Sequence, residues 1–215
     1  MNKKDENDFQ KEFKKHLDEA VDTFKEMKSP GKFNMKEEFK NAIEVVKLNE
    51  KEMHSVATRK TTAATAILFI LLATIAMNLG IYLQFMRFEF LKPSLGWFLI
   101  NGLIYLVFVV LFIFIYDVVA GQLFKGKGTF GELFRVMGYG NFVMVLAIFP
   151  MLGALAGIWY LVITYKALTV VKKLNPTNAV LTIVVTVVIG FVISALLASL
   201  VGYAPLSMVG YDLTF

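Results

Sequence analysis

The chain has 215 residues, of which 57% are hydrophobic and only 18% are charged. Because the apolar residues gather in long runs, this composition excludes an ordinary soluble domain and indicates an integral membrane protein. Cysteine is absent and the only histidines are His16 and His54, so we expect no disulfide, no cysteine nucleophile, no catalytic zinc cluster, and neither a metal nor another cofactor.

The formal charge of +5 is unevenly distributed. Residues 1–60 carry 14 Lys and Arg against 13 Asp and Glu, whereas residues 61–215 carry 8 against 4. The excess therefore lies on the loops between apolar segments, which is typical of membrane topology and of contact with anionic lipid. No basic patch is large enough to predict nucleic-acid binding.

Residues 1–60 predict a cytoplasmic amphipathic helical segment, without the layout of a signal peptide. A first helix is indicated by apolar residues at intervals of three and four, and Ser29-Pro30-Gly31 is expected to end it. A second helix begins after Asn34, a candidate N-cap with Glu37 three residues on, as in a capping box. The first stripe comprises Phe9, Phe13, Leu17, Ala20, Phe24 and Met27, and the second comprises Phe39, Ile43, Val46 and Met53.

Two interpretations of this segment remain open. The helices lie either on the membrane surface or against the protein's own cytoplasmic face, as amphipathic helices do. Alternatively, they form a docking arm for a partner.

Five apolar segments are long enough to cross a bilayer, and they predict an all-α, polytopic membrane protein. We expect a short turn at 150–153, where proline removes a backbone donor and glycine tolerates the reversal, and a turn at 174–177 before the last span. Residues 206–215 form a short tail. The expected spans are 63–85, 95–119, 129–149, 152–171 and 178–201.

Basic residues predict the orientation. With a cytoplasmic N-terminus, the inner loops hold Arg59, Lys60, Lys125, Lys127, Lys172 and Lys173, whereas the outer segments hold only Arg87 and Lys92. This satisfies the positive-inside rule and places the C-terminus outside. In a four-span alternative, residues 129–149 are interfacial or re-entrant and the C-terminus lies inside.

Four charged residues fall near the expected cytoplasmic end of the spans: Asp117, Glu132, Arg135 and Lys166. Since unpaired charges in lipid are costly, one interpretation is a charge network that fixes how three helices meet. In this interpretation Arg135 pairs with Glu132 on its own helix or with Asp117 on the preceding one. The other interpretation is a site for an ion, a proton or a lipid headgroup.

The remaining motifs indicate packing rather than catalysis. Gly153 and Gly157 form a GxxxG pattern, which is typical of close helix packing within one chain or between copies, so a homo-oligomer is possible. Nucleotide-binding, metalloprotease and serine-hydrolase fingerprints are absent, and we expect a protein that is not an enzyme.

The stretch FKGKGTFGELFRVMGYGNF at 124–142, together with a proline break, a Gly-Ile-Trp at 157–159 and a KLNPTNA turn at 173–179, resembles the Yip family of Ypt/Rab-interacting membrane proteins. The resemblance spans roughly residues 40–205 and implies a five-span helical domain with a cytoplasmic N-terminal segment. Its motif positions are Gly128, Phe130, Gly131, Phe134, Arg135, Gly138, Tyr139, Gly140, Pro150 and Trp159.

Eukaryotic members of that family are associated with Rab GTPases and vesicle traffic. The acidic Asp-Leu-Tyr-Gly-Pro type motif that precedes their first span is absent from residues 1–62, so the resemblance does not extend to GTPase binding. Lysine outnumbers arginine by 19 to 3, which favours a prokaryotic-type member in a cytoplasmic membrane.

We therefore expect a non-enzymatic integral membrane protein that organises or adapts other membrane components in the bilayer, with residues 1–60 as its contact. The alternative is a transporter or channel for small solutes or ions that acts as an oligomer.

Overall fold

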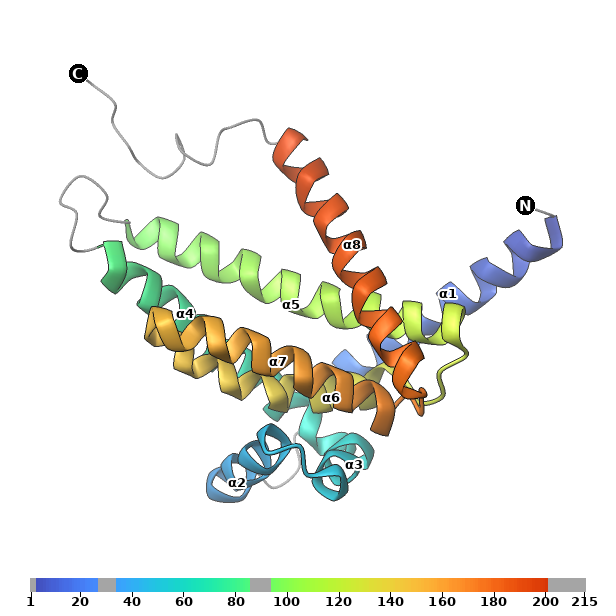
Figure 1. The fold of residues 1–215 in the computed structure, drawn as a ribbon, viewed down its shortest axis with the longest axis horizontal. Coiled ribbons are helices and arrows are strands. Elements are labelled where there is room, and N and C mark those ends of the chain that lie inside the picture. Colours follow the sequence, from blue (N-terminus) through green and yellow to red (C-terminus); the bar gives the residue numbers. More distant parts are fainter. Residues whose placement is uncertain (1–2, 27–33, 86–93, 201–215) are drawn as a thin grey trace.

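A computed structural model of the chain describes residues 3–26, 34–85 and 94–200, and within these ranges every regular element is a helix (Figure 1). Five of the described helices are long and apolar enough to span a membrane, so the predicted all-α, five-span fold class is confirmed. The elements are α1 (Lys3–Glu26), α2 (Met35–Val46), α3 (Glu50–Thr58), η1 (Lys60–Thr62), α4 (Ala63–Phe85), α5 (Leu95–Phe124), α6 (Phe130–Gly140), η3 (Asn141–Ile148), α7 (Pro150–Val170) and α8 (Pro176–Leu200).

The third span is built from two kinds of helix. Its α-helical part, α6, ends at Gly140, and η3 continues as a 3₁₀ helix. A 3₁₀ helix rises about 2.0 Å per residue against about 1.5 Å for an α-helix, so the 19 residues reach about 32 Å instead of about 28 Å. The span expected at 129–149 is therefore not one continuous α-helix, but the segment still has the length of a span.

The connection between the third and fourth spans is shorter than expected. α7 begins at Pro150, and Phe149 alone separates it from η3. Proline is favoured at the first helical position because its fixed φ suits the helix and its missing N–H has no partner there in any case. The predicted four-residue turn therefore forms the first turn of α7.

The second span is longer than expected. α5 continues beyond Val119 to Phe124 and ends where Lys125 adopts a left-handed conformation, with φ of 55°. Asp117 consequently lies inside a helix, two turns before its end. The helix continues past this charge because Asp117 has partners, which are described below.

The second N-terminal helix is broken in two. Asn34 caps α2 as predicted, since its side chain accepts a hydrogen bond from the Glu37 N–H. Leu48 then takes a positive φ of 64°, and Asn49 starts α3 by accepting from the backbone N–H groups of Lys51 and Glu52. The predicted end of the first helix at residues 29–31, the outer loop 86–93 and the tail 206–215 lie outside the described residues.

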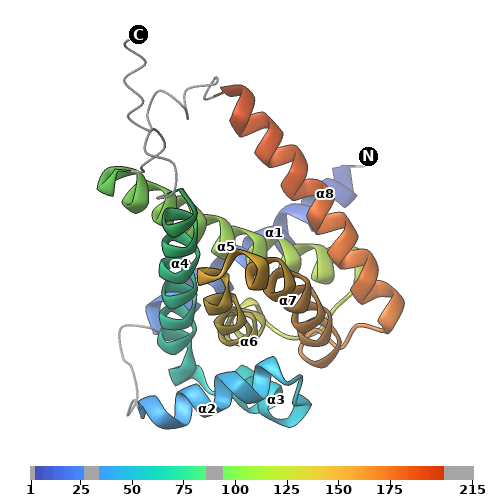
Figure 2. The same ribbon diagram turned by 60° about the vertical axis from the view of Figure 1, so that its left-hand side comes forward.

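α6 lies at the centre of the molecule. It packs against α1, α2 and α3 as well as against the spans α4, α5 and α7. Figures 1 and 2 both show α2 and α3 along one side of the α6 and α7 pair, with α1 running past the opposite side. The N-terminal segment and the membrane spans therefore share one core, which includes Val45, Met53, Phe69, Phe134 and Ile163.

A close approach of α6 to α4 depends on Gly138. A Cβ atom at this position would lie 2.6 Å from the Ala66 Cβ and 3.0 Å from the Ala66 Cα. Only glycine permits the two helices to meet at this separation. The C-terminal end of α6 is thus held against the first turn of α4.

Candidate functional site

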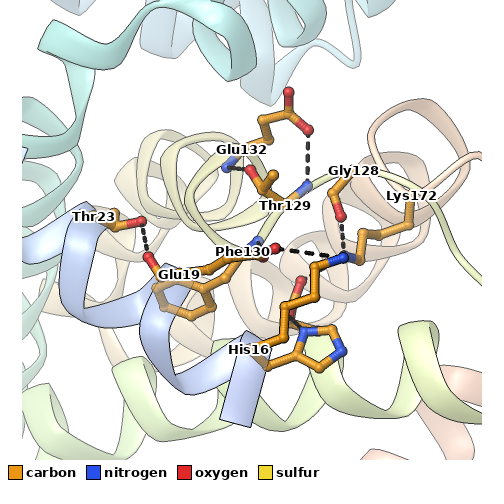
Figure 3. A network of polar contacts seen from close by, with 10 residues as sticks. His16, Glu19, Thr23, Gly128, Thr129, Phe130, Glu132 and Lys172 are labelled. Atoms are coloured by element: carbon orange, nitrogen blue, oxygen red, sulfur yellow. Dashed lines mark hydrogen bonds and ion pairs between the residues drawn. The ribbon is translucent and has the colours of Figure 1, made fainter. Parts of the chain in front are cut away.

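The start of α6 is held by carboxylates from two helices (Figure 3). Thr129 and Glu132 form a capping box within the helix, in which the Glu132 carboxylate accepts from the Thr129 N–H at 2.9 Å. The next N–H, that of Phe130, donates to the Glu19 carboxylate of α1 at 3.0 Å. Negative groups are favoured at a helix N-terminus, so Glu19 joins α1 to α6 at an electrostatically suitable point.

A buried ion pair lies beside this cap. The Lys172 Nζ is 2.6 Å from Asp117 Oδ1, both side chains are fully buried, and Nζ also donates to the Gly128 carbonyl at 2.6 Å. The second Asp117 oxygen, Oδ2, lies 2.5 Å from His16 Nδ1 on α1. A buried charge is tolerated when it is paired and hydrogen-bonded. The Asp117 carboxylate on α5 meets this condition, because His16 on α1 and Lys172 after α7 are its partners.

Arg135 is the second buried charge of the site. Its side chain is 6% exposed, its Nε and Nη2 donate to the Ala57 carbonyl at 2.9 and 2.6 Å, and its Nη1 lies 3.3 Å from the Glu26 carboxylate. The guanidinium thus links α6 to the end of α3 and to the last turn of α1. Because arginine cannot deprotonate to avoid burial, these contacts are what make its position tolerable.

The opposite side of the bundle contacts α2 and α3 through three more polar bonds. The Tyr139 hydroxyl donates to Glu38, the Trp159 indole N–H donates to the Val46 carbonyl at 2.9 Å, and Lys166 Nζ lies 2.6 Å from Glu50. The hydrogen bond and the positive charge of Lys166 hold the pKa of the Glu50 carboxyl below its usual value. Every one of these bonds joins the N-terminal segment to a membrane span.

The four charged residues singled out in the sequence do not form one cluster. Asp117 pairs with Lys172 and His16, and Arg135 pairs with Glu26, so the expected Asp117–Arg135 pair is not formed. Glu132 caps its own helix instead of pairing with Arg135. The expectation failed because the N-terminal helices fold back and supply partners for three of the four residues.

The residues of this site that the sequence did not reveal are His16, Glu19, Glu26 and Glu50. For Lys172 the sequence indicates only a role in topology, whereas the structure pairs it with Asp117. A signal was present in α1, where His16, Glu19, Thr23 and Glu26 recur at intervals of three and four beside the apolar stripe. A polar stripe at helical spacing is also typical of a solvated face, so the sequence alone could not distinguish the two.

The polar residues of α1 border a cavity of ≈ 460 Å³. Its other wall is the glycine-rich loop between α5 and α6, where Gly128 has a φ of +66° and a Cβ would lie 2.6 Å from the Val171 carbonyl oxygen. The Lys127 N–H donates to the Lys172 carbonyl at 2.7 Å, which fixes this loop against the turn after α7. The loop therefore has one defined shape beside the buried ion pair.

Residues 44–198 match the family model described as the Yip1 domain. The chain belongs to the Yip1 domain family. The match contains all the spans except the last residues of α8, and it agrees with the resemblance carried by the 124–142 motif. No curated protein and no solved structure matches the chain.

In this Yip1 domain, most of the motif positions lie within α6. Phe130, Phe134 and Tyr139 are fully buried. Gly131 faces Thr23 of α1, and a Cβ at residue 131 would lie 2.6 Å from the Thr23 hydroxyl. A Cβ at Gly140 would lie 2.5 Å from the Ile163 Cγ2 of α7. The motif residues thus shape the contacts of α6 with its neighbours, including those with the N-terminal helices.

The two glycines of the GxxxG pattern have different surroundings. A Cβ at Gly153 would lie 3.2 Å from the Ala147 Cα, so this glycine contributes to packing of α7 against η3 within the chain. A Cβ at Gly157 would meet nothing within 4 Å. The helix-packing interpretation therefore applies within this chain only to Gly153.

Proposed function

We propose that this Yip1-domain protein is a non-enzymatic adaptor that organises other membrane proteins, and that its docked N-terminal helices are the contact surface. The observation that carries the proposal is the orientation of α1. This helix attaches to the membrane domain through His16, Glu19 and Glu26. Phe13 and Phe24 of its apolar row also contact aromatic rings of α5 and α6, yet the row remains partly exposed. Phe9, Phe13, Leu17, Val21 and Phe24 are between 38% and 52% exposed.

An exposed apolar row on a helix that is already docked is a suitable surface for a second helix. Phe13 packs edge-on against Phe114 of α5, so the row is continuous with the side of the second span. A partner that contacts α1 could therefore contact the membrane domain at the same time. The bilayer itself is the competing occupant of this row.

A photoreactive amino acid placed in the row tests the proposal in intact membranes. Adducts with the same discrete proteins should form from Phe13 and from Leu17. Lys11, which is exposed on a different stripe of α1, is the matched control and should give none of them. Adducts with lipid alone, equal adducts from Lys11, or an unchanged set of partners after deletion of residues 1–60 would contradict the proposal.

We also propose a cytoplasmic N-terminus and an external C-terminus. The inner loops carry the lysines that favour this orientation, and the native chain has no cysteine that could interfere with labelling. Single cysteines at Ser94 and Ser207 should react only from outside, whereas those at Lys3, Lys127 and Asn175 should react only from inside. Labelling of Ser207 solely from inside would support the four-span arrangement instead.

The alternative function, transport of an ion or small solute, was suggested by the charges of the third span. Arg135 and Glu132 are occupied by contacts within the chain, which supports a structural role for them. Protein-dependent flux of protons, cations or small metabolites into proteoliposomes would reverse this preference.

A further inference from the structure

Three side chains that bind metals in other proteins converge where α1 meets α5. His16, Glu19 and Asp117 each offer a ligand atom, and these atoms all lie within 4.8 Å of one another. His16 and Glu19 are three residues apart on α1, so they share a face of the helix, and Asp117 reaches them from α5. We propose that these residues bind a divalent transition-metal ion of the zinc class.

The ligand set fits this class of ion. One imidazole nitrogen and two carboxylate oxygens are ligands that zinc and cobalt accept, with bonds of about 2.0–2.2 Å and tetrahedral geometry. Ligand atoms in such a site are about 3.3 Å apart, so Glu19 must approach and the His16–Asp117 contact must open slightly. Coordination through His16 Nδ1 leaves the ring proton on Nε2.

An ion pair and a hydrogen bond already orient the carboxylates. Lys172 holds Asp117 Oδ1, and the Phe130 N–H holds Glu19 Oε2. Each carboxylate therefore keeps one oxygen directed by a second partner. The other oxygens, Asp117 Oδ2 and Glu19 Oε1, would face the metal once Oδ2 exchanges its contact with His16 Nδ1 and Oε1 exchanges its 3.9 Å contact with the exposed Lys15 ammonium. Fixation of ligands by an outer layer of hydrogen bonds is a general feature of metal sites in proteins.

The site is accessible to an ion from one side. His16 and Glu19 line the ≈ 460 Å³ cavity, from which water can supply a fourth ligand. The rest of its charged lining is mixed, with Glu12 and Glu132 beside Lys15, Lys125 and Lys127. Lys172 neutralises one of the two ligand carboxylates, so the site has less negative charge than a structural zinc site and should bind reversibly. A bound ion would join α1 to α5, which goes beyond the proposed adaptor role by making docking of the N-terminal segment depend on a metal.

Cobalt binding by the full-length protein in detergent, purified without a polyhistidine tag, tests the proposal. Wild-type protein should develop a visible Co²⁺ absorption band at about one ion per chain, and Zn²⁺ should abolish that band by displacement. His16→Ala should lose the band. His54→Ala removes the only other histidine, which is exposed on α3, and should bind like the wild type.

A second variant separates loss of a ligand from loss of folding. Glu19→Gln keeps a carbonyl oxygen that can accept from the Phe130 N–H but removes the charge, and it should weaken cobalt binding about tenfold or more. Zn²⁺ should raise the unfolding temperature of the wild type and of His54→Ala, and at the same concentration it should raise that of Glu19→Gln by a smaller amount. A wild-type protein without the band, or a band of equal affinity in His16→Ala or Glu19→Gln, would overturn the proposal.

Discussion

Lys172 Nζ lies 2.6 Å from Asp117 Oδ1, and neither side chain is exposed to solvent. The pair joins α5 to the residues that follow α7, and His16 extends it to α1. Three segments far apart in the sequence thus meet at one charge, and the stability of the docked N-terminal segment should depend on it.

Breaking this pair should destabilise the protein strongly. Lys172→Met leaves Asp117 buried without its ammonium partner, and the expected loss is about 3–5 kcal/mol. Adding Asp117→Asn should recover much of that loss, because the uncompensated charge is then gone. Unfolding temperatures of the two single variants and the double variant in detergent measure this coupling; strictly additive losses would show that the residues are not partners.

The same assay tests whether Arg135 and Asp117 interact with each other. Because these residues have different partners, the losses caused by Asp117→Asn and Arg135→Gln should add in the double variant. Recovery of stability in that double variant would instead indicate a direct pair between them.

Arg135 should be less tolerant of replacement than its partner Glu26. The Glu26 side chain is 27% exposed and can be rehydrated, whereas the Arg135 side chain is 6% exposed and makes two bonds to the Ala57 carbonyl. Arg135→Lys cannot reproduce this two-pronged geometry and should resemble Arg135→Gln in unfolding temperature. Equal losses for Glu26→Gln and Arg135→Gln, or wild-type stability of Arg135→Lys, would contradict this account.

Identical substitutions at two glycines should have opposite effects. Gly138→Ala places a methyl group 2.6 Å from the Ala66 Cβ and should cost about 1–3 kcal/mol through overpacking. Gly157→Ala meets nothing within 4 Å and should be neutral or stabilise the helix by up to about 1 kcal/mol. Unfolding temperatures in detergent measure both, and a Gly138→Ala variant as stable as the wild type would mean that α6 and α4 are not in close contact.

The Glu50–Lys166 pair predicts a small effect of pH. Since folding lowers the pKa of Glu50 from its usual 4.5, the pair stabilises the folded protein above that pH, and this contribution is lost as the pH falls through the lowered value. The side chain of Glu50 is 62% exposed, so salt should weaken the effect. Glu50→Gln should differ from the wild type in stability at pH 7 and converge with it in acid; a constant difference would argue against the pair.

The five spans could be predicted because bilayer thickness sets the length of an apolar run, whatever its neighbours. Details within the spans could not. The change from α6 to η3 occurs inside one apolar run, and hydropathy does not distinguish an α-helix from a 3₁₀ helix there. The end of α5 was placed too early because Asp117 looked like a boundary, and only its partner Lys172, 55 residues later, explains why the helix continues.

The candidate site was the least predictable part. Glu132 and Arg135 are one helical turn apart, a spacing that favours a local pair. The capping box uses Glu132, however, and Arg135 binds Ala57 and Glu26, which precede it by 78 and 109 positions in the sequence. Such partners depend on how α1 and α3 dock. Helical periodicity identifies the faces of those helices without revealing which face contacts the spans.

Docking of α1 against α6 in the membrane can be detected with a disulfide trap. A Cβ at residue 131 would lie 3.6 Å from the Thr23 Cβ, within the range of about 3.5–4.5 Å that a disulfide requires. Because the native chain has no cysteine, Thr23→Cys with Gly131→Cys introduces only this pair. Lys11→Cys with Gly131→Cys is the control, since Lys11 lies about 18 Å from Thr23 along α1.

Mild oxidation of intact membranes should protect both thiols of the 23/131 variant from maleimide and leave those of the control reactive. Equal and complete labelling of the two variants would show that α1 is not docked, and would contradict the account.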